Sequence, residues 1–472
     1  MSDPGPTRRL CNYLASVDYE DLPTHIVERS RYLLLDGVAC GLVAAQLPWS
    51  QRAVAGTLAV DGAGDATLWG WERQTTALSA ALLNGTFVQG FELDDFHPHG
   101  ALHSSSVVVP AALAAAETMG GLDFERFLTA LVLGYETGPR VGIALGGARV
   151  TVRGWHSGAV FGPLAAAAAA AKVYDLDSDG FESALGNAAT RAGALMAAQY
   201  KSMVKRMHHG MASSAGLHGA ALAKAGFIGI EDVIEQPYGG LASTMLGEEP
   251  DDIGRVSRGL GEEWTMLDIG IKRHACLIML HSAVDALISL RERPGYAAAD
   301  IASLKIGVSE SVFKRTSWKL ERPGTSLGSQ MNLHFAAAVA LIDGAAYVEQ
   351  FAPASLARQG VWDLMDRIEV YHSAAIDELG RDRRFVTHID IATVAGDSIR
   401  LVGQPPQDRP FSADDVTGKY RGLLANIVAP DRIDAIEKLI LGADAQTDVR
   451  ELADLLAGVV LSPFASAAGA AE

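Results

Sequence analysis

The feature that most constrains the fold is a run of seven consecutive alanines at residues 165–171, inside a longer apolar segment. Alanine has the highest helix propensity, and a helix of alanines is apolar on every side. Such a helix is buried in a globular protein, and its small side chains allow neighbouring helices to approach closely. The sequence therefore predicts a helix at residues 162–174 in the middle of a helical bundle.

Segments on both sides of this run repeat the helical spacing of apolar residues. Gly, Pro or Asp flank these segments, as is usual where helices begin and end. The expected helices are residues 22–44, 77–88, 107–117, 124–143 and 181–198. Three prolines at positions 405, 406 and 410 then interrupt the chain, and residues 414–458 return to an amphipathic helical pattern.

The pattern between these helical parts is different. Four β-rich stretches with partial alternation are expected to be strands, at residues 301–308, 367–371, 385–394 and 398–402. Residues 395–397 form the expected hairpin turn, and residues 331–344 and 353–357 are expected to be helical. We therefore expect a mainly α protein in two parts. Residues 1–268 and 405–472 form a large all-helical domain, and residues 269–404 form a smaller, inserted α+β lid domain.

The charge and cysteine content exclude several classes of partner and cofactor. The net charge of −17 disfavours binding to nucleic acid or to anionic membrane surfaces. Residues 1–10 lack the apolar run of a signal peptide, and the longest apolar stretch, residues 158–171, is shorter than a membrane span. The three cysteines lie far apart, so the sequence does not support a zinc or iron–sulfur site. We expect a cytoplasmic protein without nucleic acid, membrane or metal partners.

Ionisable residues are densest at residues 91–105. This segment contains the carboxylates Glu92, Asp94 and Asp95 and the imidazoles His97, His99 and His103. A carboxylate beside an imidazole selects its tautomer and supports general acid or base chemistry. Asp94 with His97 and His99 also offers metal ligands, although this spacing is not that of known zinc motifs. Besides acid–base chemistry and a metal site, the third interpretation of residues 91–105 is a solvated loop without a functional role.

Three further segments combine histidines with cations or with a helix start. Residues 154–163 place His156 before the alanine helix, residues 201–210 contain Lys205 and His208, and residues 272–281 contain Lys272 and His274. Each segment also has an interpretation without a functional role. Residues 154–163 could be an ordinary helix start, residues 201–210 a basic stretch on the surface, and residues 272–281 the solvated end of a strand or helix. The sequence contains no dinucleotide or phosphate-loop motif. Together the four segments predict an electropositive pocket where charge that develops on a small polycarboxylate is stabilised.

In this order the four segments resemble the MmgE/PrpD family, which includes 2-methylcitrate dehydratase, cis-aconitate decarboxylase and iminodisuccinate epimerase. The resemblance runs from about residue 22 to residue 458. The matching motifs are the acidic loop at residues 92–95 with the His-Ser-Ser turn at 103–105, the Gly-Trp-His element at 154–156, the Lys-Arg-Met-His-His-Gly run at 205–210, and the segment at 272–281.

The resemblance implies a helical domain, an α+β lid, a cleft between them, homodimers and no cofactor. It implies functional roles for Glu92, His103, His156, Lys205 and Lys272. Asp94 is added to this catalytic set because it lies near His103 in the sequence. Substrate-binding roles are predicted for Asp95, His97, His208 and His274. We expect a carboxylate to orient His103, and His156 to stay neutral at its helix N-terminus.

In residues 272–281, Arg273 and His274 stand where the family has Pro-Tyr, and Leu277 replaces a second Cys. Three further positions also differ from the family pattern. Phe96 stands where a Thr is typical, Asn332 replaces a Ser, and Phe335 replaces a Tyr whose phenol would donate a proton. The epimerase branch also lacks that Tyr. The sequence thus predicts a cofactor-independent lyase, a dehydratase or a decarboxylase, that acts on a small di- or tricarboxylate. The alternatives are an isomerase or epimerase of a dicarboxylate and a non-catalytic carboxylate-binding protein.

Overall fold

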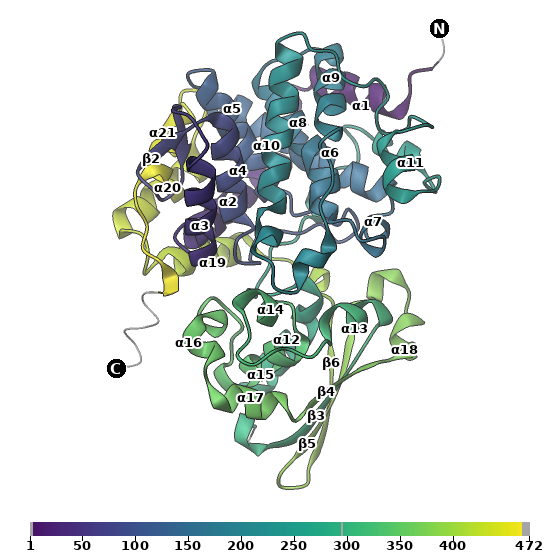
Figure 1. Cartoon of the computed structure of the whole chain (residues 1–472), viewed down its shortest axis with the longest axis vertical. Helices are drawn as coiled ribbons and strands as arrows, with labels where there is room; N and C mark the ends of the chain where they lie inside the picture. The colour runs from purple at the N-terminus through teal and green to yellow at the C-terminus, as the bar shows by residue number, and fades with distance from the viewer. Residues whose placement is uncertain (1–2, 294–295, 465–472) are drawn as a thin grey trace.

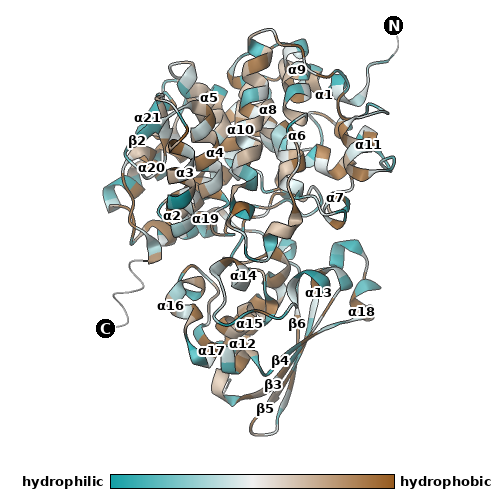
Figure 2. Ribbon diagram, viewed as in Figure 1, coloured by the Kyte–Doolittle hydropathy of each residue, from teal (hydrophilic) through white to brown (hydrophobic). Residues whose placement is uncertain are grey.

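The alanine-rich helix lies at the centre of the helical part of the molecule. The computed structural model describes residues 3–293 and 296–464, and here α8 (Ser157–Val173) packs among four other helices. All seven alanines are buried, and the central helices in Figure 2 are largely apolar. The predicted central helix is therefore confirmed. It begins at Ser157 and not at residue 162, because Pro163 is accommodated within the helix.

The chain before residue 269 supplies most of the surrounding helices. They are α1 (Pro6–Ser16), α2 (Thr24–Ala44), α3 (Pro48–Leu58), α4 (Ala77–Val88), α5 (Ser105–Thr118), α6 (Phe124–Ala144), α7 (Arg149–Val152), α9 (Ser178–Ala189), α10 (His208–Lys224) and α11 (Leu241–Leu246). A short hairpin is formed by β1 (Ala66–Leu68) and β2 (Arg73–Thr75). The expected helix over 181–198 was too long, since the chain leaves α9 and passes through Gly193 at a φ of +129°.

The end of the chain joins the same helical body. Three helices follow the proline-rich break, α19 (Ala413–Leu424), α20 (Pro430–Gly442) and α21 (Arg450–Ala457). α19 packs on α2, and the N–H of Gly70 donates a hydrogen bond to the carbonyl of Leu456 (2.8 Å). Figure 1 shows these yellow helices beside the purple helices from the start of the chain.

A four-stranded sheet and its helices form the other part of the molecule, drawn below the helical body in Figure 1. The strands are β3 (Ile301–Val308), β4 (Ile368–His372), β5 (Thr387–Thr393) and β6 (Ser398–Gly403). Their order is β4-β3-β5-β6, with β3 and β4 parallel and the other pairs antiparallel. Burial alternates along β5, and Gly396 takes a φ of +95° in the hairpin turn before β6.

Helices cover this sheet and connect it to the helical body. They are α12 (His281–Arg291), α13 (Glu310–Thr316), α14 (Ser326–Gln330), α15 (Leu333–Asp343), α16 (Pro353–Leu356), α17 (Gln359–Met365) and α18 (Ala374–Asp377). α12 contacts both α15 and the strands β5 and β6. The predicted fold class, mainly α with a smaller α+β part, is confirmed.

The domain bounds remain a proposal, with residues 269–404 as the lid. Residues 1–2, 294–295 and 465–472 of the expected domains lie outside the described residues. Within the described ranges, no single helix has both the length and the apolar composition to cross a membrane. α2 and α3 meet those criteria only as a pair, and this pair is bent by 86°.

Candidate active site

Two glycines bring the histidine-bearing helix α10 close to α4. An ideal Cβ placed on Gly210 would lie 2.0 Å from the carbonyl oxygen of Leu82, and one placed on Gly85 would lie 2.8 Å from the Cα of Gly210. A side chain at either position would force the two helices apart. This close crossing places His208, at the start of α10, and Lys205, in the short 3-10 helix before it, next to the acidic loop that follows α4.

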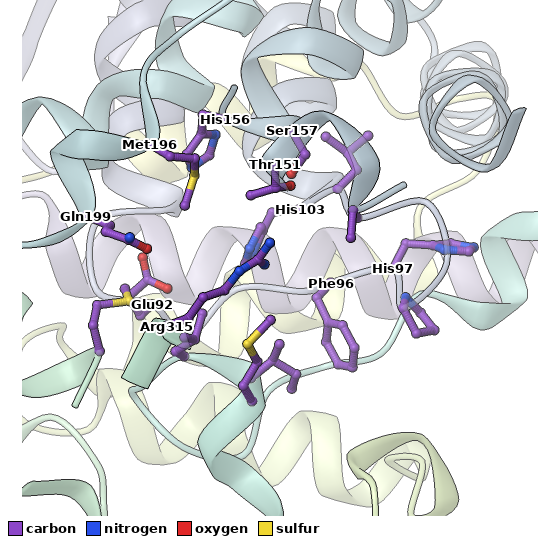
Figure 3. A pocket seen from close by; sticks show the side chains of 18 of the residues that line it. Glu92, Phe96, His97, His103, Thr151, His156, Ser157, Met196, Gln199 and Arg315 are labelled. Atoms are coloured by element: carbon purple, nitrogen blue, oxygen red, sulfur yellow. The ribbon is translucent and has the colours of Figure 1, made fainter. Parts of the chain in front are cut away.

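A pocket with a volume of about 140 Å³ lies between the helical body and the 269–404 segment. Figure 3 shows ionisable side chains pointing into it from several elements. The helical body contributes Glu92, Phe96, His97, His103, Thr151, His156, Ser157, Gln199 and Lys205. The 269–404 segment contributes Leu277, Ile278, Met279, Arg315, Met331, Arg384 and Phe385. A concave site with a few convergent polar groups suits a small ligand.

Glu92 is the centre of a buried charge network. Its carboxylate accepts hydrogen bonds from the Lys205 ammonium and, at 3.3 Å, from that of Lys272. Burial would raise the pKa of the Glu92 carboxyl, but the two ammonium groups outweigh it and hold that pKa well below its usual range. The Glu92 backbone has a φ of +58°, and such strained residues are common at active sites. Both lysines are therefore paired with Glu92 within the protein.

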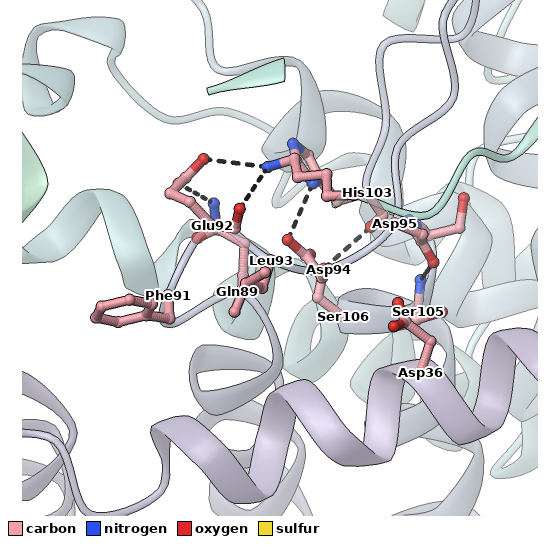
Figure 4. A network of polar contacts seen from close by, with 12 residues as sticks. Asp36, Gln89, Phe91, Glu92, Leu93, Asp94, Asp95, His103, Ser105 and Ser106 are labelled. Atoms are coloured by element: carbon pink, nitrogen blue, oxygen red, sulfur yellow. Dashed lines mark hydrogen bonds and ion pairs between the residues drawn. The ribbon is translucent and has the colours of Figure 1, made fainter. Parts of the chain in front are cut away.

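The two neighbouring aspartates have different surroundings, which Figure 4 shows. Asp94 Oδ1 lies 3.2 Å from His103 Nδ1, which leaves His103 Nε2 free of Asp94. Asp95 accepts the backbone N–H groups of Ser104 and Ser105 at the start of α5. Burial and the Asp94 charge raise the pKa of Asp95 to about 6. Asp94 thus positions an imidazole at the pocket, and Asp95 holds the backbone of the loop.

His97 also stabilises the loop, although its ring reaches the pocket wall. Its Nδ1 accepts the N–H of Gly100 at 2.8 Å, and its Nε2 lies 3.0 Å from the carbonyl of Thr265. Burial lowers the pKa of His97 to about 4, so the ring is neutral near pH 7. Both ring nitrogens are occupied by backbone groups, and His97 contributes shape to the pocket.

Three more histidines pack behind His103. The ring of His156 lies 4.6 Å from that of His208 and 5.1 Å from that of His209, measured between centroids. Burial lowers the pKa of His156 and His209 well below the usual range and that of His208 to about 4. His156 caps the start of α8, lines the pocket and has no hydrogen-bond partner for Nδ1. A Cβ on Gly158 would lie 1.7 Å from His209 Nε2, so the cluster requires glycine there.

The residues of the metal hypothesis do not meet at one point. Asp94 contacts His103, His97 contacts backbone groups, and His99 lies 3.9 Å from Asp382 on the surface. Across residues 3–293 and 296–464, no group of three or more His, Cys, Asp or Glu side chains is arranged to hold a metal ion.

Several expected site residues lie away from the pocket lining. Lys272 is fully buried behind Glu92, and His208 lies behind His156. His274 pairs with Asp285, its Nε2 2.7 Å from the Asp285 carboxylate. None of these three lines the described pocket. Conversely, Arg315, Arg384, Thr151 and Gln199 were not predicted from the sequence, because each stands in a stretch without a distinctive motif. Ser157 follows His156 in a predicted segment, but no role was assigned to it.

The departures from the family pattern at residues 96, 332 and 335 have different surroundings. Phe96 lines the pocket, so the hydroxyl expected there is absent, although Thr151 places one on the same wall. Phe335 is fully buried, and its ring centroid lies 5.8 Å from that of Trp362. The Asn332 side chain caps α15 by accepting the Phe335 N–H at 3.1 Å. The change from Tyr to Phe at 335 therefore takes place in the apolar core, away from the pocket.

A mainly helical body, an α+β part and a pocket of paired acids, imidazoles and lysines between them define an enzyme. The chain matches the MmgE/PrpD N-terminal domain over residues 8–252 and the MmgE/PrpD C-terminal domain over residues 274–443. It belongs to the MmgE/PrpD family. The gap between the two matches includes the expected boundary at 268/269, and the C-terminal match includes α19 and α20.

Characterised relatives match the chain over nearly its whole length. It is 39% identical to the cis-aconitate decarboxylase-like protein oryM of Aspergillus oryzae, over 96% of this chain and 97% of that protein. It is 34% identical to a cis-aconitate decarboxylase of Aspergillus terreus, over 98% of this chain and 97% of that protein. The human cis-aconitate decarboxylase is 25% identical, over 93% of this chain and 91% of that protein. The protein is an enzyme of the lyase type.

Proposed function

We propose that the protein is a cofactor-independent decarboxylase of a small unsaturated tricarboxylate of the cis-aconitate type. The observation that carries the proposal is that His103, oriented by Asp94, shares one pocket with Lys205, which is held by Glu92. The names of the relatives favour decarboxylation over the other activities of the family. By the family resemblance, we also propose that the enzyme is a homodimer.

The proposed reaction needs one proton and releases one molecule of CO₂. In prop-1-ene-1,2,3-tricarboxylate, the bond between the methylene carbon and its carboxylate breaks, and the electron pair forms a new double bond. The electrons of the old double bond then take up a proton at the far carbon. The product is 2-methylidenebutanedioate. The enzyme must therefore supply a proton donor at carbon and stabilise the charge that develops on the adjoining carboxylate.

His103 is the proposed proton donor. In the imidazolium form of His103, Nδ1–H donates to Asp94 and Nε2–H is free to protonate the substrate carbon, which leaves the ring neutral with its proton on Nδ1. Solvent returns the proton to His103 after each turnover. His156 is neutral, because burial holds its pKa well below the usual range, and it acts as a hydrogen-bonding group in the pocket.

Lys205 is the proposed electrostatic stabiliser. It lines the pocket, and its ammonium faces both Glu92 and the place where charge develops. Lys272 is fully buried and acts through Glu92, whose carboxylate it holds in place. Of the two lysines, we therefore propose that only Lys205 meets the substrate directly.

Two alternatives from the sequence lose support. The missing phenol at position 335 favoured the epimerase interpretation, but Phe335 packs in the core beside Trp362 and does not line the pocket. A non-catalytic binding protein is disfavoured by the family relationship to lyases. Dehydration would use the same types of catalytic groups as decarboxylation. The NMR experiment described next distinguishes the two reactions.

The decisive experiment follows cis-aconitate by NMR in D₂O. We expect CO₂ release and a product with one deuterium in its saturated methylene group. Propane-1,2,3-tricarboxylate, which lacks the double bond, is the matched control and should remain unchanged. Loss of water from 2-methylcitrate without CO₂ release from any tricarboxylate would contradict the proposal, as would solvent exchange alone.

A further inference from the structure

One arginine of the lid side faces the pocket, and within the described part of the chain its side chain has no hydrogen-bond or ion-pair partner. Arg315, on α13, lines the pocket, and Figure 3 shows its side chain extending from the lid side toward the centre. The other lining cations are occupied. Lys205 is paired with Glu92, and Arg384 donates to the carbonyls of Arg381 (2.8 Å) and Pro98 (2.9 Å). Among residues 3–293 and 296–464, none forms a hydrogen bond or ion pair with Arg315.

The electrostatic surroundings of Arg315 favour an anion. Burial lowers the pKa of the Arg315 guanidinium, and no carboxylate in the described part of the chain offsets this effect. The Arg315 charge in turn contributes to lowering the pKa of Arg384, so the two guanidinium groups lie near one another. A guanidinium stays charged in a protein, and a partly buried charge without a counterion is costly. A carboxylate of the substrate would remove that cost.

The proposed reaction restricts which carboxylate of the substrate can pair with Arg315. A carboxylate that leaves as CO₂ loses its charge in the transition state, and a cation beside it would stabilise the ground state more than the transition state. A carboxylate that the substrate keeps stays charged throughout, so an ion pair with it contributes to binding without slowing the reaction. The neighbours of Arg315 in the pocket, Met279, Met331 and Phe385, offer an apolar surface for the departing group.

We propose that Arg315 binds a carboxylate that the substrate retains and thereby selects tricarboxylates over dicarboxylates. This inference rests on the proposed function. The forked guanidinium pairs with a carboxylate through two parallel hydrogen bonds, which a lysine cannot reproduce. Arg315 is then a specificity-determining residue contributed by the lid side.

The test compares binding of two unreactive acids by calorimetry, propane-1,2,3-tricarboxylate and pentanedioate. Wild type should bind the tricarboxylate about 10- to 100-fold more tightly, the range of a charge-assisted pair. Arg315→Gln should reduce this preference to within about threefold. The matched control is Lys314→Gln on the same helix, since the Lys314 side chain is 68% exposed and pairs with Glu310. This control should keep the full preference.

A second variant covers the case that Arg315→Gln does not fold. Arg315→Lys keeps the charge and loses the fork, so it should weaken the tricarboxylate about 3- to 10-fold and leave pentanedioate unchanged. Equal weakening of the binding of both acids in either Arg315 variant would overturn the inference. An unchanged preference for the tricarboxylate in Arg315→Gln, or no such preference in wild type, would also overturn it. The proposed function is judged separately by CO₂ release, which these binding measurements do not use.

Discussion

The two walls of the pocket differ in how their charges are partnered. On the wall of the helical body, Glu92 holds Lys205 and Asp94 contacts His103 before any substrate is present. The lid-side wall is largely apolar, and within the described chain its Arg315 has no counterion. We therefore propose that the helical body supplies fixed groups for the chemistry, and that the lid side supplies shape and charge for recognition.

The difference follows from burial. Glu92 and Asp94 are fully buried, where an unpaired charge is costly, so each is paired inside the protein. Arg315 is accessible from the pocket, so water or substrate can solvate it. Substitutions on the two walls should therefore have different consequences, and four predictions test this on the body wall.

The largest expected effect is that of His103→Gln on turnover. Loss of the proposed proton donor should lower kcat by about 10²- to 10⁴-fold, the usual contribution of a general acid. The unfolding free energy should change little, because His103 is partly exposed, with 20% of its side chain accessible. Steady-state CO₂ release and denaturant unfolding measure the two quantities.

His25→Gln is the matched control for this variant. His25 is exposed on α2, so the control should keep wild-type turnover. Turnover of His103→Gln within about threefold of wild type would show that the proton comes from another group.

Glu92→Gln should most strongly affect stability. The substitution leaves two buried ammonium groups without their carboxylate, and breaking a buried pair costs about 3–5 kcal/mol. Urea unfolding should show this loss. The control is Glu310→Gln, which breaks the exposed pair with Lys314 and should cost less than about 1 kcal/mol. Equal effects of the two variants would mean that the body wall is not held by the Glu92 network.

Gly158→Ala should disturb the histidine cluster. Its methyl group would collide with the His209 ring, and such overpacking costs about 1–3 kcal/mol. Displacement of His209 should also shift His103, whose ring centroid is 5.1 Å away, and so lower kcat. Gly422→Ala on α19 is the control, since an added Cβ meets nothing within 4 Å there, and it should raise stability slightly. If Gly158→Ala left kcat unchanged, the cluster would not position His103.

The last prediction concerns the pH dependence of the unfolding free energy. His156, His208 and His209 have pKa values lowered by burial, so below about pH 6.5 the unfolded chain binds protons that the folded protein does not. The unfolding free energy should therefore fall between about pH 6.5 and pH 4, by up to about 1.4 kcal/mol per pH unit for each histidine. Asp95 opposes this below pH 6, because its raised pKa makes the folded protein bind a proton first.

His208→Gln tests this origin of the pH dependence. It should reduce the slope of unfolding free energy against pH, measured by urea titrations at several pH values. A slope equal to that of wild type would show that the buried histidines do not control it.

Local patterns were sufficient to predict most elements. The bounds of α4 and β3 are those expected from the sequence, and the alanine run is buried in α8. The pairing of Asp94 with His103 could also be predicted from the sequence, since the two residues lie on one short loop. In each case the interactions that determine the local structure are between residues that are near in sequence. Hydrophobic periodicity or turn residues therefore predict them.

Tertiary packing decided the rest of the site. Lys272 reaches Glu92 from 180 positions along the chain, and Arg315 enters the pocket from a helix with no distinctive motif. The pattern of residues 272–281 gave no indication that His274 pairs with Asp285, outside the pocket lining. The sequence by itself determined the elements and the types of catalytic group. Which distant side chains meet was decided by tertiary packing, between the helical body and the lid side and also within the body. The close crossing of α4 and α10 at Gly85 and Gly210 is an example within the body, and local sequence patterns do not record it.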